Sequence, residues 1–492
     1  MEKVLSTSKS VFTKERVLLG LIFVFGALYT ASAYFNLQTE LILPFVLLFL
    51  LIFILQGYFA GFLSIIVLTM IFEHFFTLAP LTLFGSEFKI YALDFIIIFS
   101  IISYFLHERI RNKRRITFGS LKTPLLIFAG LCLFSFIYGV LRGGDAAVAF
   151  SSFKNYALYA VLYIMTINFV NIKDKLRELI NTILVTGLGL TLFIVVGIVR
   201  GEGIWAEYNI LSTEGARLIA ASHGFYLGIV VLFALPLYLS SNIILKKWAF
   251  PVIVFQIFGI IISLSRHLWI GLAVSLALIF ILVPRIQKKK MLKSFALYGG
   301  LFIAGLSVLV WGYALVIGNV SALIPSDFFA NIAQRFSSIS FINADDPSGL
   351  WRLFLWQKSL ALLAQSPFIG IGFGSAVTFD FLGYPIDAEV RSMHNSFLGI
   401  LVQMGAIGLL AFLALIAKIF YGFVRNFKQM SGIYKAIAIG ALANVIYFLI
   451  LANFGVYFEL NSLVVFFWIL VGILEVSIIF SKREHEKSNR LK

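Results

Sequence analysis

Three side chains in this sequence have the chemistry to hold an anion and to activate a hydroxyl group. They are Arg217, Arg266 and His394, and each lies where an apolar helix is predicted to begin. A guanidinium keeps its proton and can hold two oxygens of a phosphate at once. An imidazole with an ordinary pKa near ~6.5 can accept a proton from a hydroxyl at neutral pH. The combination suits a reaction in which a pyrophosphate leaves without the help of a metal ion.

A structural explanation competes with the chemical one for each of these residues. Many acidic side chains lie in the same loops as the arginines, so any one arginine could simply be ion-paired. His394 could be an interfacial residue that caps the helix after it. The sequence Gly370-x-Gly-x-Gly374 follows no predicted strand, so it is not a dinucleotide-binding loop. It predicts a tight turn that brings backbone close to either a helix or a ligand.

Metal and redox chemistry have little support in the residue pattern. The six histidines are scattered over different loops without a His-x-x-x-His pair. Asp345 and Asp346 are adjacent, unlike the Asp-x-Asp of metal-dependent sugar-nucleotide transferases. The single cysteine, Cys132, lies inside an apolar run, so one chain can form neither a disulfide nor a cysteine metal site. We therefore expect no metal and no cofactor.

The elements that would position these side chains are membrane-spanning helices. Hydrophobic residues make up 61% of the chain and charged residues 13%, and the mean hydropathy is +0.99, which excludes a soluble domain. We predict an all-α polytopic membrane protein with about 14 transmembrane helices. The apolar runs are residues 17–35, 39–55, 58–78, 90–106, 122–141, 153–170, 177–199, 220–240, 247–264, 267–284, 294–318, 394–421, 433–451 and 461–480.

The net charge of +16 is distributed between the spans and indicates topology, not nucleic-acid binding. Lysines and arginines cluster in every second loop, for example at 109–122, 285–293 and 418–435. Cytoplasmic loops of membrane proteins carry this excess, so both termini are predicted to be cytoplasmic. The first apolar run is interpreted as an uncleaved helix, although its basic leader resembles that of a signal peptide. No nucleic-acid partner is expected.

The longest predicted loop, residues 319–393, is extracytoplasmic under this topology. Loops of such length are usually functional. Apolar residues recur at helical spacing over 350–364, beside Trp351 and Trp356, which predicts an amphipathic helix on the outer leaflet. A small folded lid without membrane contact is the alternative. The chain therefore divides into N-terminal transmembrane helices (1–318), an outer loop or lid (319–393), and C-terminal transmembrane helices with a cytoplasmic tail (394–492).

Several motifs follow one another within residues 348–410. Arg352 and Trp356 form Arg-x-x-x-Trp on the predicted amphipathic helix, and residues 367–374 read Pro-x-x-Gly-x-Gly-x-Gly. His394 then begins His-Asn-Ser-x-Leu, and Gly405 begins Gly-x-x-Gly. This order resembles the O-antigen ligase and O-antigen polymerase family of bacterial membrane glycosyltransferases.

The resemblance implies roles for particular residues. In that family a polyprenyl-pyrophosphate-linked glycan docks from the membrane, arginines hold its pyrophosphate, and a histidine at the start of a late helix serves the acceptor hydroxyl. By motif, catalysis falls to His394, and pyrophosphate binding falls to Arg217, Arg266 and Arg352. Arg391 is added to the pyrophosphate-binding group on its position alone. The large number of spans is closer to the polymerases than to the ligases, which leaves the acceptor open.

The resemblance also implies a function and a location. It predicts a metal-independent glycosyltransferase of lipopolysaccharide biosynthesis in the bacterial inner membrane, with its active site on the extracytoplasmic face. Its partners would be an undecaprenyl pyrophosphate-linked glycan donor, a hydroxyl of the lipid A core, and membrane lipids. One alternative is a polysaccharide polymerase that joins lipid-linked repeat units. A flippase for lipid-linked oligosaccharides is the alternative from another class, although transporters usually carry mid-membrane charges and inverted repeats.

Overall fold

The computed structural model describes residues 57–73, 76–77, 90–199, 220–240, 246–263, 265–317, 347–381 and 383–490. The chain forms two compact units. One unit comprises residues 1–118 and 164–189, and the other comprises 119–163 and 190–492. Every site residue that falls within the described ranges belongs to the second unit. The three-part division at residues 318 and 393 stays a prediction.

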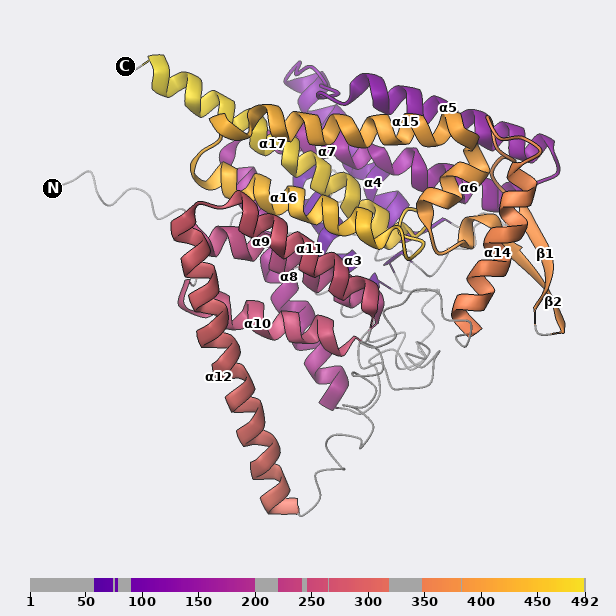
Figure 1. Ribbon diagram of the computed structural model, residues 1–492. Helices are drawn as coiled ribbons and strands as arrows, with labels where there is room; N and C mark the ends of the chain where they lie inside the picture. Colours follow the sequence, from indigo (N-terminus) through magenta and orange to yellow (C-terminus); the bar gives the residue numbers. More distant parts are fainter. Residues whose placement is uncertain are drawn as a thin grey trace, which may run out of the picture. The chain divides into compact units, whose positions relative to one another are not determined.

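Helices make up most of the described residues of both units (Figure 1). The first unit contains α3 (Tyr58–Ile71), α4 (Ala92–Tyr104) and a π-helical segment (Phe105–Arg111). Two helices have residues in both units, α7 (Val161–Phe169) and α8 (Lys173–Val199). The second unit contains α5 (Lys122–Leu141), α6 (Ala146–Tyr156), a 3-10 turn (Leu158–Ala160), α9 (Ala221–Leu239), α10 (Lys246–Ile262), α11 (Arg266–Leu282), α12 (Arg285–Ile317), α14 (Pro347–Leu363), α15 (Ser396–Asn426), α16 (Gly432–Leu451) and α17 (Asn461–Arg490), with further 3-10 turns at Val390–Ser392 and Phe427–Gln429.

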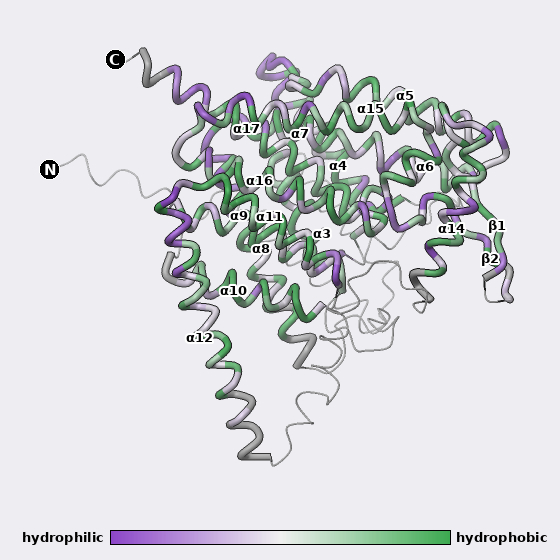
Figure 2. Tube along the Cα trace, viewed as in Figure 1, coloured by the Kyte–Doolittle hydropathy of each residue, from purple (hydrophilic) through white to green (hydrophobic). Residues whose placement is uncertain are grey.

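Among the described residues, six helices are long and apolar enough to cross a membrane: α5, α9, α12, α15, α16 and α17. Shorter apolar helices cover residues 58–71, 248–262 and 266–282. Figure 2 shows the apolar residues along most of α15 and α16. The protein is therefore a polytopic helical membrane protein, as predicted. The predicted total of about 14 spans is not established, and the runs 17–35 and 39–55 lie outside the described residues.

Helix α16 packs against α9, α11 and α17 in the second unit. The Tyr447 ring of α16 lies over two glycines, and a Cβ added at Gly228 of α9 or at Gly271 of α11 would come within 2.5 or 2.8 Å of that ring. Small residues allow membrane helices to approach closely in this way. Farther along, Asn444 Nδ2 donates to the carbonyl of Ile229 at 3.3 Å. These contacts make α9 and α16 antiparallel and bring the first turns of α9 and α11 to the last turn of α16.

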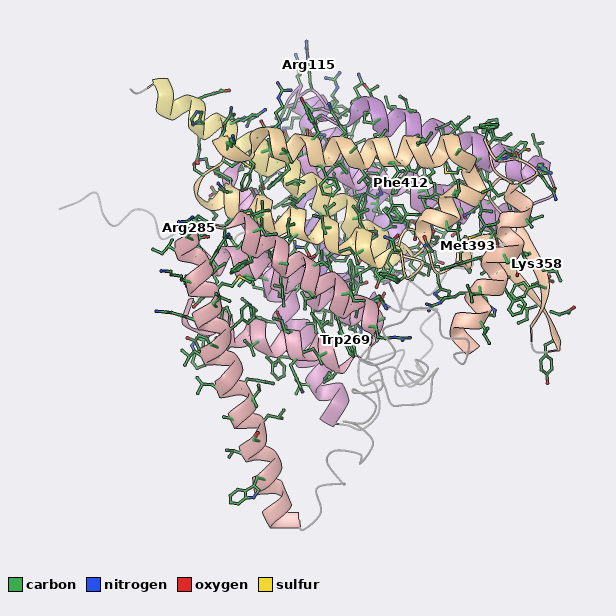
Figure 3. All side chains as sticks on the ribbon, viewed as in Figure 1. Arg115, Trp269, Arg285, Lys358, Met393 and Phe412 are labelled. Carbon is green, nitrogen blue, oxygen red and sulfur yellow. The ribbon has the colours of Figure 1, made fainter. Side chains whose placement is uncertain are left out.

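The two ends of this helix group differ in charge. At one end Lys290 Nζ donates to the carbonyl of Tyr238 at 2.6 Å, which joins the basic start of α12 to the end of α9. At the other end, the starts of α9, α11, α15 and α17 lie near the end of α16. Figure 3 shows Arg285 at the first end, and Trp269 and Met393 toward the second. Within the second unit, the basic start of α12 and the candidate site residues therefore lie at opposite ends of this helix group.

The long loop has more structure than the sequence predicts. Helix α14 lies where the amphipathic helix is predicted, but an antiparallel hairpin of β1 (Ala376–Phe381) and β2 (Tyr384–Glu389) follows it. Side chains from alternate positions of the hairpin share a core with Leu355 of α14. Gly383, at φ +85°, lies in the tight turn of the hairpin. An all-α description therefore omits one small two-stranded sheet.

The glycine-rich turn at residues 370–374 lets backbone segments pack closely against one another. Gly370, Gly372 and Gly374 all have positive φ. A Cβ at Gly372 would lie 2.3 Å from the Gly139 Cα of α5, and one at Gly370 would lie 2.5 Å from backbone atoms of α15. Only glycine tolerates both the left-handed backbone and so close an approach. The observed contacts of these glycines thus favour packing over ligand contact.

Backbone hydrogen bonds hold this segment between α5 and α15. Gly372 N donates to the carbonyl of Gln403 at 2.9 Å, and Phe373 N donates to that of Ser135 at 3.0 Å. Helix α15 breaks at Gly405, whose φ of 67° is not helical. The N–H of the next residue, Ala406, donates to the carbonyl of Pro367 at 2.9 Å. The first part of α15 is consequently fixed against α5 and the hairpin, and it carries the candidate site.

Candidate functional site

His394 lies in a tight turn that ends at the first residue of α15. Its φ of 52° is a left-handed conformation that side-chain-bearing residues rarely adopt. Trp356 Nε1 of α14 donates to the carbonyl of Met393 at 2.8 Å, and Ser396 N donates to the carbonyl of Ala452 at 2.8 Å. Hydrogen bonds on both sides of His394 therefore hold its backbone in place.

The helix cap is the next residue, not the histidine. Asn395 is the N-cap of α15, and its Oδ1 accepts a hydrogen bond from the N–H of Leu398 at 3.0 Å. An asparagine in this role is typical of helix N-termini. The alternative in which His394 caps the helix is therefore wrong, and its imidazole is available for other contacts.

His394 lines a pocket of about 470 Å³ between α11, α14, the start of α15 and the end of α16. Its polar groups come from Arg352, His394, Asn395 and Asn453. Side chains of α11, α14 and α16 such as Ile270, Leu353 and Ile450 form its apolar part. A pocket with an apolar wall and a few polar groups is the usual form of a small-molecule site.

The charges of the pocket favour an anion and a neutral imidazole. The described residues that line it include one guanidinium and no carboxylate. Burial, and then the charge of Arg352, lower the pKa of His394 to about 4. The Trp351 ring meets the imidazole edge-on at 5.8 Å between centroids. At neutral pH the His394 ring thus has a free lone pair beside a fixed positive charge.

A buried carboxyl group lies behind this turn. Glu459, in the connection between α16 and α17, is 7% exposed. It accepts hydrogen bonds from Ser396 Oγ at 2.6 Å and from the Tyr156 hydroxyl. Burial raises the pKa of Glu459 to about 7. No local motif points to Glu459, because its contact with Ser396 spans 63 positions of the chain.

The predicted pyrophosphate-binding arginines are only partly brought together. Arg352 lines the pocket with His394. Arg266 is the first residue of α11, one turn before the pocket residue Ile270 and on the same helix face. Arg391 does not line the pocket, because its Nε pairs with Glu389 at 2.6 Å and its Nη1 donates to Ser151 Oγ at 2.8 Å. Arg217 lies outside the described residues.

A further contact joins α11 to the connection that holds Glu459. His267 Nε2 lies 3.0 Å from the Tyr457 hydroxyl, so the residue after Arg266 is tied to the loop between α16 and α17.

As for metals, the described residues contain no group of three or more His, Cys, Asp or Glu that could hold an ion. The described side chains of the pocket can bind an anion and transfer a proton.

Residues 251–413 match the family model described as O-antigen ligase. The matched range contains Arg266, Arg352, Arg391 and His394, whereas Arg217 and Glu459 fall outside it. The resemblance to the O-antigen ligase family is thereby confirmed over this part of the 492-residue chain. No curated protein matched the chain.

Proposed function

We propose that this protein is a glycosyltransferase that moves a glycan from a polyprenyl pyrophosphate to an acceptor hydroxyl. The observation that carries the proposal is the shared pocket of His394 and Arg352, which has an apolar wall and lies at the end of the second unit's helices remote from the basic start of α12. Under the positive-inside rule that end is extracytoplasmic. The family match supports the bacterial inner membrane as the protein's location, and the positive-inside rule supports two cytoplasmic termini.

In the proposed reaction the arginines bind the leaving group. The pyrophosphate departs with two electrons from the anomeric carbon, so negative charge builds up on its bridging oxygen. A guanidinium stabilises that charge in a partly buried site, where electrostatic effects are stronger than in water. We assign this role first to Arg352 and then to Arg266 and Arg217, without a metal ion. Arg391 stays a prediction by position, since its observed contacts with Glu389 and Ser151 favour a structural role.

His394 is the proposed general base. Its neutral imidazole takes the proton of the acceptor hydroxyl while the hydroxyl oxygen attacks the anomeric carbon. One carbon–oxygen bond forms as the bond to pyrophosphate breaks, and attack from the opposite face inverts the configuration. A bound pyrophosphate would offset the positive charge of Arg352, and so raise the pKa of His394 toward the range in which a base is most effective.

Whether the protein acts as a ligase or as a polymerase depends on which acceptor it uses. A ligase would use a hydroxyl of the lipid A core, and a polymerase would use a second lipid-linked glycan. Both use the same base and the same leaving group, and the family match supports either one.

Purified protein incubated with a polyprenyl-pyrophosphate-linked glycan and each acceptor in turn tests the proposal. We expect a new glycosidic product and released polyprenyl pyrophosphate with one of the two acceptors, also in the presence of chelator. Movement of the lipid-linked glycan across a vesicle bilayer without any product would instead identify a flippase.

A further inference from the structure

The pocket contains two amide side chains that neither the proposed base nor the proposed pyrophosphate site uses. Asn395 and Asn453 both line it, together with Arg352 and His394. Asn395 precedes the first turn of α15, and Asn453 follows the last turn of α16. Two separate elements therefore each bring one amide to the same cavity.

Hydrogen bonds to the backbone determine which polar atom of each asparagine amide remains for a ligand. The oxygen and nitrogen of an asparagine are told apart by their hydrogen bonds. Asn395 Oδ1 accepts from the N–H of Leu398 at 3.0 Å, which leaves Nδ2 as a donor. Asn453 Nδ2 donates to the carbonyl of Leu449 at 2.8 Å, which leaves Oδ1 as an acceptor. Within the described part of the chain, neither remaining atom has a hydrogen-bond partner.

A donor paired with an acceptor discriminates between the parts of a lipid-linked glycan. The pyrophosphate of a lipid-linked glycan is esterified at both ends and fully ionised at neutral pH, so it offers acceptors to Asn395 Nδ2 but no hydrogen to Asn453 Oδ1, and a polyprenyl chain offers neither. A sugar hydroxyl both donates and accepts, and an acetamido group has an N–H and a carbonyl. Among the parts of a lipid-linked glycan, only the substituents of the sugar rings can satisfy both amides.

We propose, on the basis of the proposed function, that Asn395 Nδ2 and Asn453 Oδ1 bind hydroxyl or acetamido groups of the sugar ring at the reacting centre. Asn453 is then a specificity-determining residue for that ring. Asn395 adjoins His394, so the ring lies beside the base that serves the attacking hydroxyl. The ring belongs either to the donor, next to the pyrophosphate, or to the acceptor, and the chemistry of recognition is the same for both.

Direct binding to the full chain in lipid nanodiscs tests this proposal separately from catalysis. Three probes are compared: polyprenyl pyrophosphate, the same lipid carrying one sugar, and a free acceptor saccharide. The variants are Asn453→Leu, which removes the acceptor atom, and Asn453→Gln, which keeps an amide. Asn426→Leu is the matched control, because Asn426 Nδ2 also donates to its own helix, at 2.6 Å to the carbonyl of Gly422, at the opposite end of the helix group.

We expect Asn453→Leu to weaken binding of the sugar-bearing probe by about 3- to 10-fold, which corresponds to one neutral hydrogen bond. Binding of unglycosylated polyprenyl pyrophosphate should stay the same, Asn453→Gln should recover part of the loss, and Asn426→Leu should have no effect. A loss confined to the glycosylated lipid assigns the ring to the donor, and a loss confined to the free saccharide assigns it to the acceptor.

The proposal is overturned if Asn453→Leu and Asn453→Gln bind all three probes as the wild type does. It is overturned equally if they weaken binding of the unglycosylated lipid as much as that of the others. The proposed function fails separately: a wild-type protein that transfers no glycan, yet prefers the glycosylated lipid in an Asn453-dependent way, would keep the sugar site and lose the transferase.

Discussion

His394 joins an unusual backbone conformation to a fixed chemical environment. A left-handed residue with a side chain costs on the order of 1–2 kcal/mol, and such strain persists only where surrounding contacts determine it. The Trp356 bond to Met393 and the Ser396 bond to Ala452 supply those contacts. The result is an imidazole whose position relative to Arg352 does not depend on a flexible loop.

The lowered pKa of His394 predicts the pH dependence of transfer. The kcat/KM profile reports groups of the free enzyme, and protonation of His394 would remove the base. Since its pKa is about 4, kcat/KM should persist well below pH 6.5 before it declines. In Arg352→Gln the decline should move to higher pH, because the charge that disfavours protonation is gone. An acidic limb at pH 6.5 or above in the wild type would contradict this assignment.

The raised pKa of Glu459 predicts that the contribution of this group to stability decreases as the pH rises. Its pKa is raised to about 7 in the folded protein, above the ordinary value near ~4.5 expected once the chain unfolds. Glu459 therefore contributes stability that is full below pH 4.5 and is lost as pH rises through 7. His394, whose pKa is lowered to about 4, contributes in the opposite direction, so the wild type is compared with Glu459→Gln, in which His394 is unchanged. The thermal midpoint of the wild type minus that of Glu459→Gln, in detergent, should decrease from pH 5 to pH 8, and a difference that does not change with pH would show that Glu459 makes no such contribution.

At the scale of elements, the glycine-rich segment between α5 and α15 determines where the site forms. Phe373 of this segment stacks on Tyr156 at 5.7 Å between ring centroids, and Tyr156 in turn bonds Glu459. The same segment leads directly into β1. Packing of this turn therefore links α5, the hairpin and the carboxyl group behind His394.

A pair of glycine substitutions separates close packing from backbone strain. Gly372 and Gly143 have φ of +87° and +86°, but a Cβ at Gly372 meets Gly139 at 2.3 Å whereas a Cβ at Gly143 meets no atom within 4 Å. Gly143→Ala should cost only the left-handed backbone, about 1–2 kcal/mol. Gly372→Ala should additionally force α5 and the turn apart, which lowers the thermal midpoint further and abolishes transfer. Equal midpoints for the two variants would refute the packing role.

Sequence reasoning identifies long helices better than it identifies short paired strands. The apolar runs 122–141, 433–451 and 461–480 begin at or within one residue of α5, α16 and α17, because charged or polar residues flank hydrophobic stretches of bilayer length. The hairpin alternates apolar and polar residues around Gly383, but six-residue strands inside a long polar loop give a weak signal. The break in α15 is also missed, because an isolated Gly405 usually continues a helix.

The residues of the candidate site likewise divide into those that a local motif predicts and those that it does not. His394 and Arg352 follow from motifs that are local in sequence, and the structure places both in one pocket. Tyr156, Glu459 and Asn453 have no local signature, since their importance depends on contacts between distant segments. The bond from Arg391 to Ser151 likewise depends on how α6 packs, which the sequence pattern does not specify, whereas its ion-pair partner Glu389 is only two residues away in the chain.

At the scale of the whole molecule, the charge pattern predicts sidedness. Lys289, in the first turns of α12, should face the cytoplasm, and the exposed Asp380 of the hairpin should face outward. Single cysteines at these positions can be labelled with an impermeant reagent in intact cells, and the native Cys132 is buried and gives little background. We expect labelling at position 380 and none at 289. The reverse pattern would place the site in the cytoplasm and exclude an extracytoplasmic donor.

The most direct test of the central claim is single-turnover transfer by His394→Asn, measured together with donor binding. Asparagine tolerates the left-handed backbone at this position, so the substitution removes the imidazole with little added strain. We predict that the dissociation constant for the lipid-linked glycan stays close to that of the wild type while the rate of transfer decreases by ~10²–10⁴-fold. Arg352→Ala, in contrast, should weaken donor binding as well. Transfer by His394→Asn at nearly the wild-type rate, in protein stably inserted in the membrane, would contradict the assignment of His394 as the base.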